Sequence, residues 1–353
     1  MYLMKFSILV PAYNEEQSIA SCLNSLIVLP DNKEIIVIDD ASTDLTVQTI
    51  EKFLNRGIIL VRRESNGGRA AALNSGLQRS TGDIIVTTDA DTVVPPNWLQ
   101  RFESCFKQQG VVAVGGAYQA RNKEKPLANA TSILDQILNG MFKKSVIPNK
   151  LSGVNSAIHR SALLNSGGFN ESSWWSEDSE LGWKLKEIGK VMYDPDNRVN
   201  TTYPDTWADV WRRKFYWGYA MGLKFKKQVL YNIRLWLRPL LFMALFMSLL
   251  AFLVTIPYGI NVYLVPGSIF FILLSTLTIF FIPFGMIVML RNGDREFFKT
   301  LSLLAILPVF REFAYIYGMY WGFCNNHREM IRPTWKDELH CRDTKDREEN
   351  ISV

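Results

Sequence analysis

The first 230 residues alternate short runs of consecutive apolar residues with amphipathic stretches. The apolar runs have the length and flanking turn residues of buried strands, at 6–10, 34–39, 58–61 and 83–88. Apolar side chains recur at helical spacing between them, at 15–28, 46–54 and 69–79. A further strand is expected at 111–117, a strand and a helix start within 153–166, and a helix at 179–188. Such continuous apolar strands separated by helices predict an α/β fold, with a parallel sheet covered by helices on both faces.

Long apolar stretches replace this pattern after residue 230. The stretch 235–256 has about the length that a helix needs to cross a bilayer, and 262–290 is longer but interrupted at Pro283. A third stretch, 300–323, carries Arg311 and Glu312 at its middle. A charge at the bilayer centre costs about 2.5–3.5 kcal/mol, so an interfacial or re-entrant helix is the preferred interpretation. The predicted domains are therefore a soluble domain over 1–230, a membrane region over 231–325 and a polar tail over 326–353.

The positions of Lys and Arg predict which loops face the cytoplasm. The connection 257–261 has none, whereas the loop 291–299 and the tail are basic. Two crossings place both basic segments inside, and three would place the tail outside; we favour two. The apolar run 6–10 is too short for a signal peptide. We therefore predict a multi-pass cell-membrane protein with a cytoplasmic N-terminal domain.

Charge and cysteine content narrow the choice of partners. The formal net charge of +5 is modest for 353 residues, and a basic cluster precedes the apolar region as a cytoplasmic flank does. A basic patch alone is weak evidence for nucleic acid, which is not an expected partner. The four cysteines have neither zinc-ligand nor disulfide-framework spacing, which indicates reduced thiols.

Polar clusters follow the first, second and fourth predicted strands, where parallel sheets bind their ligands. The strongest is Asp89-Ala-Asp91, since carboxylates two positions apart leave a strand on the same side and suit Mg²⁺ or Mn²⁺. Taken alone, this pair is also typical of a solvated acidic turn. It is accompanied by Pro-Ala-Tyr-Asn-Glu-Glu at 11–16, the pair Asp39-Asp40, and Asn-Gly-Gly-Arg at 66–69. A helix start with an arginine suits phosphate oxygens, although each motif could instead serve a turn or a cap.

Together these four motifs, in this order, resemble the family 2 glycosyltransferases. The resemblance implies the Rossmann-like GT-A fold, an α/β fold with a mixed, mainly parallel sheet and helices on both faces. The resemblance covers roughly residues 4–220 and continues through Leu-Ser-Gly-Val-Asn at 151–155, Gly-Gly-Phe at 167–169 and Glu177-Asp178. It implies a hexosyltransferase that takes a sugar from a UDP- or GDP-sugar, with Mg²⁺ or Mn²⁺ as cofactor.

On the donor side, the resemblance assigns the following residues by position: Pro11, Ala12, Tyr13, Glu15, Asp39, Asp40, Gly68, Arg69, Asp89 and Asp91. The first four would hold the nucleotide, and Asp40 or its neighbour Asp39 would contact the base or ribose. Gly68 and Arg69 would line the sugar-nucleotide pocket. Asp89 and Asp91 would serve as the metal pair, with Asp91 the more direct ligand.

Asp178 would be the general base of an inverting displacement, because such a reaction needs one base opposite the leaving group. An acidic pair at 177–178 also caps a helix start, and both interpretations can hold together. His159 could add a metal ligand, but a lone histidine beside a strand is more often packed. Trp174 and Trp175 could stack on an acceptor sugar or form a hydrophobic lid.

One segment departs from family members that polymerise sugars, which carry Gln-x-x-Arg-Trp after the base. Here Arg213 stands where Gln is expected and Tyr216 where Arg is expected, although Trp217 remains. A tyrosine cannot provide a bidentate cation, so transfer of a single sugar is favoured. The same stretch also fits a basic-aromatic interfacial helix. A polyprenyl phosphate or a lipid-linked glycan is the expected acceptor, since the anchor holds the site near the bilayer. The alternatives are a processive polysaccharide synthase and a non-catalytic membrane scaffold.

Overall fold

The computed structural model describes residues 4–140, 151–172, 177–228 and, near the C-terminus, 307, 310–311, 313–319 and 321. The predicted spans 235–256 and 262–290, the tail, Trp174 and Trp175 lie outside the described residues. The described residues fall into two compact units. The sheet unit comprises those within Met1–Arg121 and Lys143–Thr202, and the helical unit those within Asn122–Phe142 and Tyr203–His327.

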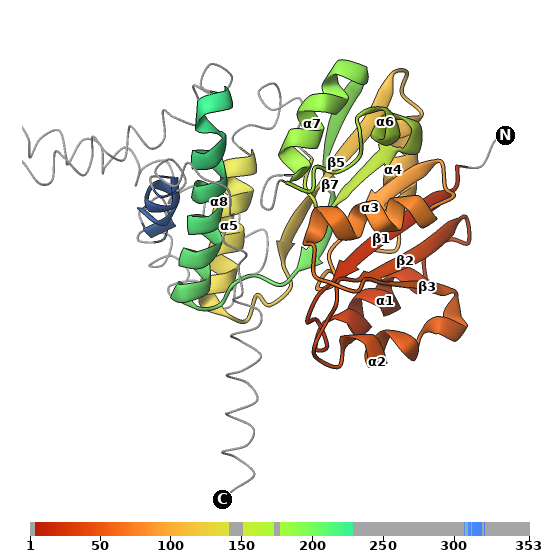
Figure 1. The fold of residues 1–353 in the computed structure, drawn as a ribbon, viewed down its shortest axis with the longest axis horizontal. Coiled ribbons are helices and arrows are strands. Elements are labelled where there is room, and N and C mark those ends of the chain that lie inside the picture. Colours follow the sequence, from red (N-terminus) through yellow and green to blue (C-terminus); the bar gives the residue numbers. More distant parts are fainter. Residues whose placement is uncertain are drawn as a thin grey trace, which may run out of the picture. The chain divides into compact units, whose positions relative to one another are not determined.

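The sheet unit is built on seven strands in the order β3-β2-β1-β4-β6-β5-β7 (Figure 1). Their bounds are β1 Phe6–Ala12, β2 Lys33–Asp39, β3 Ile58–Arg62, β4 Ile84–Thr87, β5 Val111–Ala120, β6 Ser156–His159 and β7 Lys190–Thr201. The pairings β1–β2, β1–β4, β2–β3 and β5–β7 are parallel, and β6 is antiparallel to both neighbours. This confirms the mixed, mainly parallel sheet, and it brings the ends of β1, β2 and β4 to one edge.

Helices cover both faces of this sheet, as predicted. One face packs against α1 (Ile19–Ile27), α2 (Thr46–Glu51) and α4 (Trp98–Phe106). The other packs against α3 (Arg69–Arg79), α6 (Arg160–Asn165) and α7 (Glu177–Ile188). Because central strands such as β1 and β4 contribute buried side chains to both clusters, the strands read as uninterrupted apolar runs. A short 3₁₀ turn, Leu54–Arg56, precedes β3.

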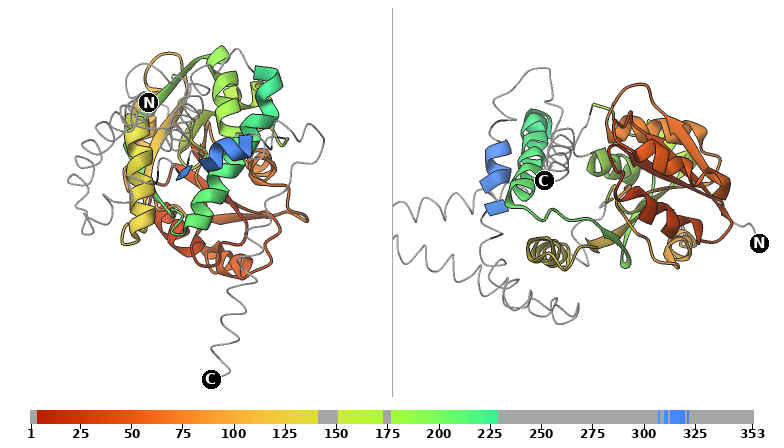
Figure 2. Two further views of the ribbon diagram at one scale, coloured as in Figure 1. Left: turned by 90° about the vertical axis from the view of Figure 1, so that its left-hand side faces the viewer. Right: turned by 90° about the horizontal axis from the view of Figure 1, so that it is seen from below.

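The helical unit contains α5 (Pro126–Gly140), α8 (Trp207–Gln228) and a helical stretch within 310–321 (Figure 2). Buried apolar residues of α5 share one cluster with Val210 of α8 and with Leu307, and half-buried Phe310 of the 310–321 stretch packs against it. Arg311 donates to Asp135 of α5 at 2.6 Å, so the charge expected at the middle of an apolar stretch is paired within the fold. Gly218 of α8 and Gly318 of the 310–321 stretch lie where the backbones of these two helical segments meet. A Cβ on Gly218 would overlap the backbone of Tyr315, and a Cβ on Gly318 would overlap the backbone of Phe215.

The boundary between units differs from the predicted domain boundary. The sheet unit ends at Thr202, and α8, which the sequence placed inside a domain ending at 230, belongs to the helical unit together with α5. Side chains on α5 and α8 face each other in one core, which no local sequence pattern reports. Within the part of the chain that the structure describes, no helix combines the length and the apolarity needed to cross a membrane.

Candidate active site at the carboxyl edge of the sheet

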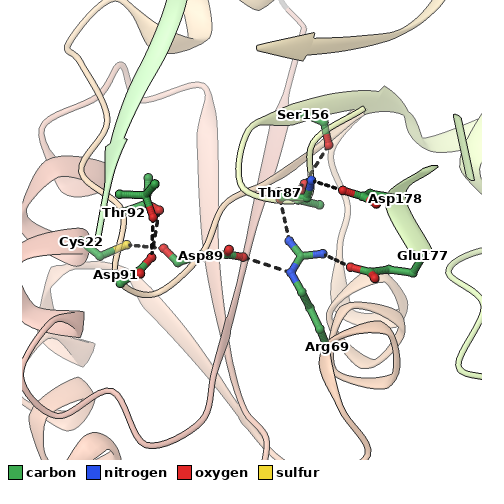
Figure 3. A network of polar contacts seen from close by, with 11 residues as sticks. Cys22, Arg69, Thr87, Asp89, Asp91, Thr92, Ser156, Glu177 and Asp178 are labelled. Carbon is green, nitrogen blue, oxygen red and sulfur yellow. Dashed lines mark hydrogen bonds and ion pairs between the residues drawn. The ribbon is translucent and has the colours of Figure 1, made fainter. Parts of the chain in front are cut away.

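Asp89 and Asp91 lie in a tight turn that follows β4. The strand ends at Thr87, and the amide of Thr92 donates to the carbonyl oxygen of Asp89 at 3.1 Å. The alternation of side chains along a strand does not extend to these residues, so the expectation that both carboxylates leave on the same side is wrong. Figure 3 shows the Asp89 carboxylate directed to Arg69 and the Asp91 carboxylate directed to Thr92.

The turn is held to its surroundings on the Asp91 side. The Oδ1 atom of Asp91 accepts hydrogen bonds from the hydroxyls of Thr201 at 3.0 Å and Thr92 at 3.2 Å. Val93 pairs with Asn200 in an isolated bridge, which fastens the chain beyond the turn to the end of β7. The turn that carries both carboxylates is therefore fixed at each end, by β4 and by β7.

Arg69 is the centre of the polar network in Figure 3. It is the first residue of α3, where Gly68 precedes it with φ +83°. Its guanidinium donates from Nε to Asp89 at 3.0 Å, from Nη1 to Glu177 at 2.8 Å and from Nη2 to the carbonyl oxygen of Gly153 at 2.6 Å. One planar cation thus joins the β4 turn, the start of α7 and the loop before β6.

Asp178 lies in the first turn of α7, as the helix-start interpretation required. Its Oδ2 atom accepts the amide N–H of Gly153 at 3.0 Å, and its side chain is half-buried. Gly153 therefore touches both partners, since its amide donates to Asp178 and its carbonyl accepts from Arg69 and from the hydroxyl of Thr87. The predicted donor-side carboxylate Asp89 and the predicted base Asp178 belong to one connected site.

The charges of this site are unevenly exposed. Glu177 is buried, whereas the side chain of Asp89 is 40% exposed. Burial and the neighbouring Asp178 raise the pKa of Glu177, against the attraction of Arg69. Burial alone would lower the pKa of Arg69, but Asp89, Glu177 and Asp178 together raise it above its ordinary value. Arg69 consequently stays charged at any physiological pH.

The ends of β1 and β2 are bound to each other beside this network. Ala12 pairs with Asp39, and the amide of Asp40 donates to the carbonyl oxygen of Ala12 at 2.9 Å. The amide of Glu15 donates to the Thr46 hydroxyl at 2.7 Å, and its carboxylate accepts from Ser18 at 2.6 Å. Pro11 lies within β1, which ends at Ala12, and half-buried Tyr13 directly follows the strand. The motif at 11–16 therefore lies at the carboxyl edge of the sheet, next to Asp39 and Asp40.

Both carboxylate oxygens of Asp40 accept hydrogen bonds from other parts of the fold. Its Oδ1 accepts from Arg63 at 2.5 Å and from the amide of Gly67 at 3.1 Å, and its Oδ2 from the amide of Gly68 at 2.7 Å. Burial raises the pKa of this carboxyl despite those donors. Asp39 is equally buried and accepts from the amide of Ser42. A contact of either residue with a base or ribose stays a prediction.

The structure adds two residues and removes one candidate. Glu177 and Gly153 join the site although neither was assigned a role there; the signal was present in the segments 151–155 and 177–178 but did not identify their partners. His159 pairs with Ile84, at the start of β4 and therefore at the opposite end of that strand from Asp89. Its ring meets the edge of Phe106 at 4.8 Å between centroids, which is the packed role.

The carboxylates of Asp89 and Asp91 suit a metal ion that binds together with the phosphates of a substrate. Among the described residues, no three His, Cys, Asp or Glu side chains are grouped so that they could enclose a metal ion. Mg²⁺ is commonly held by one or two carboxylates together with substrate phosphates, without an all-protein cage. Two half-buried aspartates in one fixed turn fit that arrangement.

Comparison with known proteins agrees with this geometry. Residues 7–167 match the family described as Glycosyl transferase family 2. Over 218 residues the chain is 31% identical to a poly-β-1,6-N-acetyl-D-glucosamine synthase of Staphylococcus aureus (strain COL), covering 60% of this chain and 53% of that protein. The synthase of Staphylococcus epidermidis is 30% identical over 220 residues, with the same shares covered. The chain thus spans about half the length of these curated relatives.

Among solved structures, a mannosyltransferase from Pyrobaculum calidifontis in complex with GDP-Man and Mn²⁺ has a similar fold. Its TM-score is 0.53 at 19% identity, and the match covers 92% of this chain and 88% of that one. At this identity, the likeness concerns the fold alone. The part of the chain that matches glycosyltransferase family 2, residues 7–167, lies mostly in the sheet unit and also includes α5 of the helical unit.

Proposed function

We propose that this protein transfers a sugar, with inversion, from a nucleotide-sugar to a membrane-associated acceptor. One observation carries the proposal: Asp89 and Asp178, which come from segments 89 residues apart, are joined through Arg69 and Gly153. Asp89, Arg69 and Gly153 lie within the residues 7–167 that match family 2. A cation between two half-buried carboxylates suits a site where a diphosphate leaves on one side and an acceptor enters on the other.

On the donor side, the residues of the β4 turn and the start of α3 face the leaving group. Asp89 and Asp91 would hold Mg²⁺ or Mn²⁺, which when bound supplies charge to neutralise the diphosphate. Arg69 adds a permanent positive charge, and the amides at the beginning of α3 favour phosphate oxygens. The edge formed by Pro11, Ala12 and Tyr13 would hold the nucleotide.

On the acceptor side, Asp178 acts as the general base. The acceptor oxygen forms a bond to the anomeric carbon while the bond from that carbon to the diphosphate oxygen breaks. The proton of the acceptor hydroxyl passes to Asp178, and the nucleoside diphosphate leaves with the bonding electrons. When the acceptor is a phosphate already ionised, no proton needs to move. The amide of Gly153 holds the Asp178 carboxylate in place for this step.

A membrane-associated acceptor is supported by the C-terminal sequence. The stretches 235–256 and 262–290 are long and apolar enough to span a bilayer, and basic residues flank them. They would keep the catalytic domain on the cytoplasmic surface, within reach of a polyprenyl phosphate or a lipid-linked glycan.

A processive polysaccharide synthase is the second candidate. It is favoured by the relatives that share 30–31% identity, which are synthases of an N-acetylglucosamine polymer. Arg213 and Tyr216 at the Gln-x-x-Arg-Trp position oppose it. Both candidates share the chemistry above and differ only in whether the product is extended again.

The test uses the full chain purified in detergent. UDP-GlcNAc, UDP-glucose and GDP-mannose are supplied one at a time with Mn²⁺ or Mg²⁺ and a membrane lipid extract, and sugar entering the lipid phase is measured. We expect one donor to give metal-dependent transfer that Asp178→Asn abolishes while donor binding by calorimetry persists. Absence of transfer with every donor would overturn the proposal. A cellular role that survives Asp178→Asn would point to the scaffold alternative.

A further inference from the structure

Glu177 is placed unlike an ordinary helix-capping carboxylate. Its side chain is 7% exposed, and its Oε1 atom accepts from Nη1 of Arg69 at 2.8 Å. An exposed carboxylate is sufficient to cap a helix. Burying the carboxylate costs free energy unless a partner is fixed to it. Here the cost is offset by the ion pair and hydrogen bond with Arg69, which also hold the guanidinium in position.

The guanidinium has three contacts on three separate segments, and its planar fork makes them interdependent. With Nε on Asp89 and Nη1 on Glu177, the plane of the group is set, and Nη2 is then directed to the carbonyl of Gly153. Removing the charge of Glu177 leaves Asp89 as the carboxylate that accepts from Arg69, so the guanidinium would move toward the β4 turn.

Gly153 transmits this position to the base. A Cβ at residue 153 would lie 2.8 Å from Cζ of Arg69, so only glycine allows the guanidinium to approach the backbone this closely. The hydroxyl of Thr87 holds the same carbonyl at 2.9 Å and also contacts Ser156 at 2.9 Å. The amide on the other side of the Gly153 Cα donates to Asp178. A shift of Arg69 would therefore reach both Asp89 and Asp178.

We propose that Glu177 is a positioning residue, which acts through Arg69 and Gly153 to hold the donor-side carboxylate Asp89 and the base Asp178 in one fixed arrangement. This inference rests on the proposed function, because it gives Asp178 the role of base. Glu177 itself touches neither substrate nor metal in this assignment. Its contribution is to hold the guanidinium of Arg69 where it bonds to Asp89 on one side and to the carbonyl oxygen of Gly153 on the other.

The experiment compares Glu177→Gln with Glu187→Gln in the full-length protein. Both change a carboxylate of α7 to an amide of equal size, but Glu187 is exposed on that helix. With UDP-GlcNAc, Mn²⁺ and the lipid extract, we expect Glu177→Gln to lower kcat by about 100-fold, the cost of a misplacement near 1 Å, and to leave the donor KM unchanged. Glu187→Gln should match the wild type in both constants.

A double-mutant cycle separates positioning from general damage. If Glu177 acts through Arg69, then Glu177→Gln should have little further effect in an Arg69→Met background. Effects on kcat that multiply independently would overturn the inference, as would a Glu177→Gln protein with wild-type kcat. Calorimetric donor stoichiometry reports the folded fraction, so a poorly folded variant does not pass for an inactive one.

A second measurement needs no turnover and so separates this inference from the proposed function. We expect hydrogen–deuterium exchange at residues 151–155 to accelerate in Glu177→Gln and to stay unchanged in Glu187→Gln, because the Arg69 hydrogen bond to Gly153 weakens. Unchanged exchange in both variants would overturn the positioning role. Accelerated exchange in a protein that transfers no sugar would leave the positioning role standing and overturn the transferase assignment alone.

Discussion

At the scale of single residues, Asp40 shows how a carboxylate at the end of a strand can be used by the fold. It is 3% exposed and accepts from Arg63 and from the amides of Gly67 and Gly68. These contacts fasten the end of β2 to the beginning of α3, and hence to Arg69. A substitution at Asp40 should therefore act on the site through the loop at 66–69.

We expect Asp40→Asn to lower the free energy of unfolding by about 1–3 kcal/mol, because a neutral amide leaves Arg63 without its buried carboxylate and can clash with a glycine amide. The melting temperature of the detergent-purified protein reports this loss. Glu51→Gln, at an exposed position of α2, is the matched control and should melt with the wild type. An unchanged melting temperature for Asp40→Asn would contradict the structural role.

At this scale the sequence identified the residues of the site, but it did not give their relative positions. Asp89, Asp178 and Arg69 were all chosen from motifs, and the structure connects them. The side-by-side placement of Asp89 and Asp91 was wrong, because β4 ends at Thr87 and a turn replaces the strand. Strand alternation can be read from sequence, but the residue at which a strand ends is set by its hydrogen-bonding partners.

At the scale of elements, the same limit explains β7 (Lys190–Thr201), which was not predicted. Its pairing with β5 jumps from Gly116–Asp194 to Ala117–Arg198, so the segment around Pro195 bulges out of the ladder. Asn155 fills the bulge by donating to the carbonyl oxygens of Ala117 and Asn197. A strand interrupted by proline has no continuous apolar pattern, and its completion depends on a side chain about 40 residues earlier in the sequence.

The contact between α5 and the 310–321 stretch gives a second prediction. Asp135 and Arg311 are mostly buried, and they pair at 2.6 Å. Burial would raise the pKa of Asp135, but Arg311, with Lys214 and Arg213, holds it well below its usual range. Asp135→Asn should cost about 3–5 kcal/mol near neutral pH, because it leaves a buried cation uncompensated. The melting temperature, with exposed Glu124→Gln as control, measures the loss.

The same pair fixes a direction for the pH dependence. A carboxyl with a lowered folded pKa stabilises above its unfolded value of 3.8, and this stabilisation is lost as the pH falls through the folded pKa. The difference in melting temperature between wild type and Asp135→Asn should be largest at neutral pH and shrink below about pH 4. A difference that is constant with pH would show that the ion pair contributes nothing through its charge.

At the scale of the whole molecule, the two compact units raise the question of how the chain is held at a membrane. The apolar stretches 235–256 and 262–290 predict that the full chain stays in the membrane pellet after a carbonate wash and is released by detergent. A soluble reporter protein expressed beside it is the control for incomplete washing. Release by high salt alone would contradict spanning helices and indicate an electrostatic surface contact instead.

Product length is the property in which the sequence motif and the relatives point in opposite directions. The curated relatives are polymer synthases, yet the polymerising motif Gln-x-x-Arg-Trp is here Arg213, Tyr216 and Trp217 on α8. The guanidinium of Arg213 lies 5.8 Å from the ring centroid of Tyr203, and Lys214 stacks 4.4 Å from the ring centroid of Trp217. Neither contact supplies the bidentate cation that the arginine of the motif would provide.

We therefore expect the wild type to add one sugar, so that gel or mass analysis of the lipid-linked product shows a single species. Arg213→Gln combined with Tyr216→Arg restores the motif and should extend the product or raise acceptor affinity, because an arginine can again grip a phosphate or carboxylate oxygen pair. Arg212→Gln on the same helix is the control for loss of basic charge alone. A polydisperse ladder from the wild type would contradict single transfer, since the motif as it stands would then be sufficient for extension.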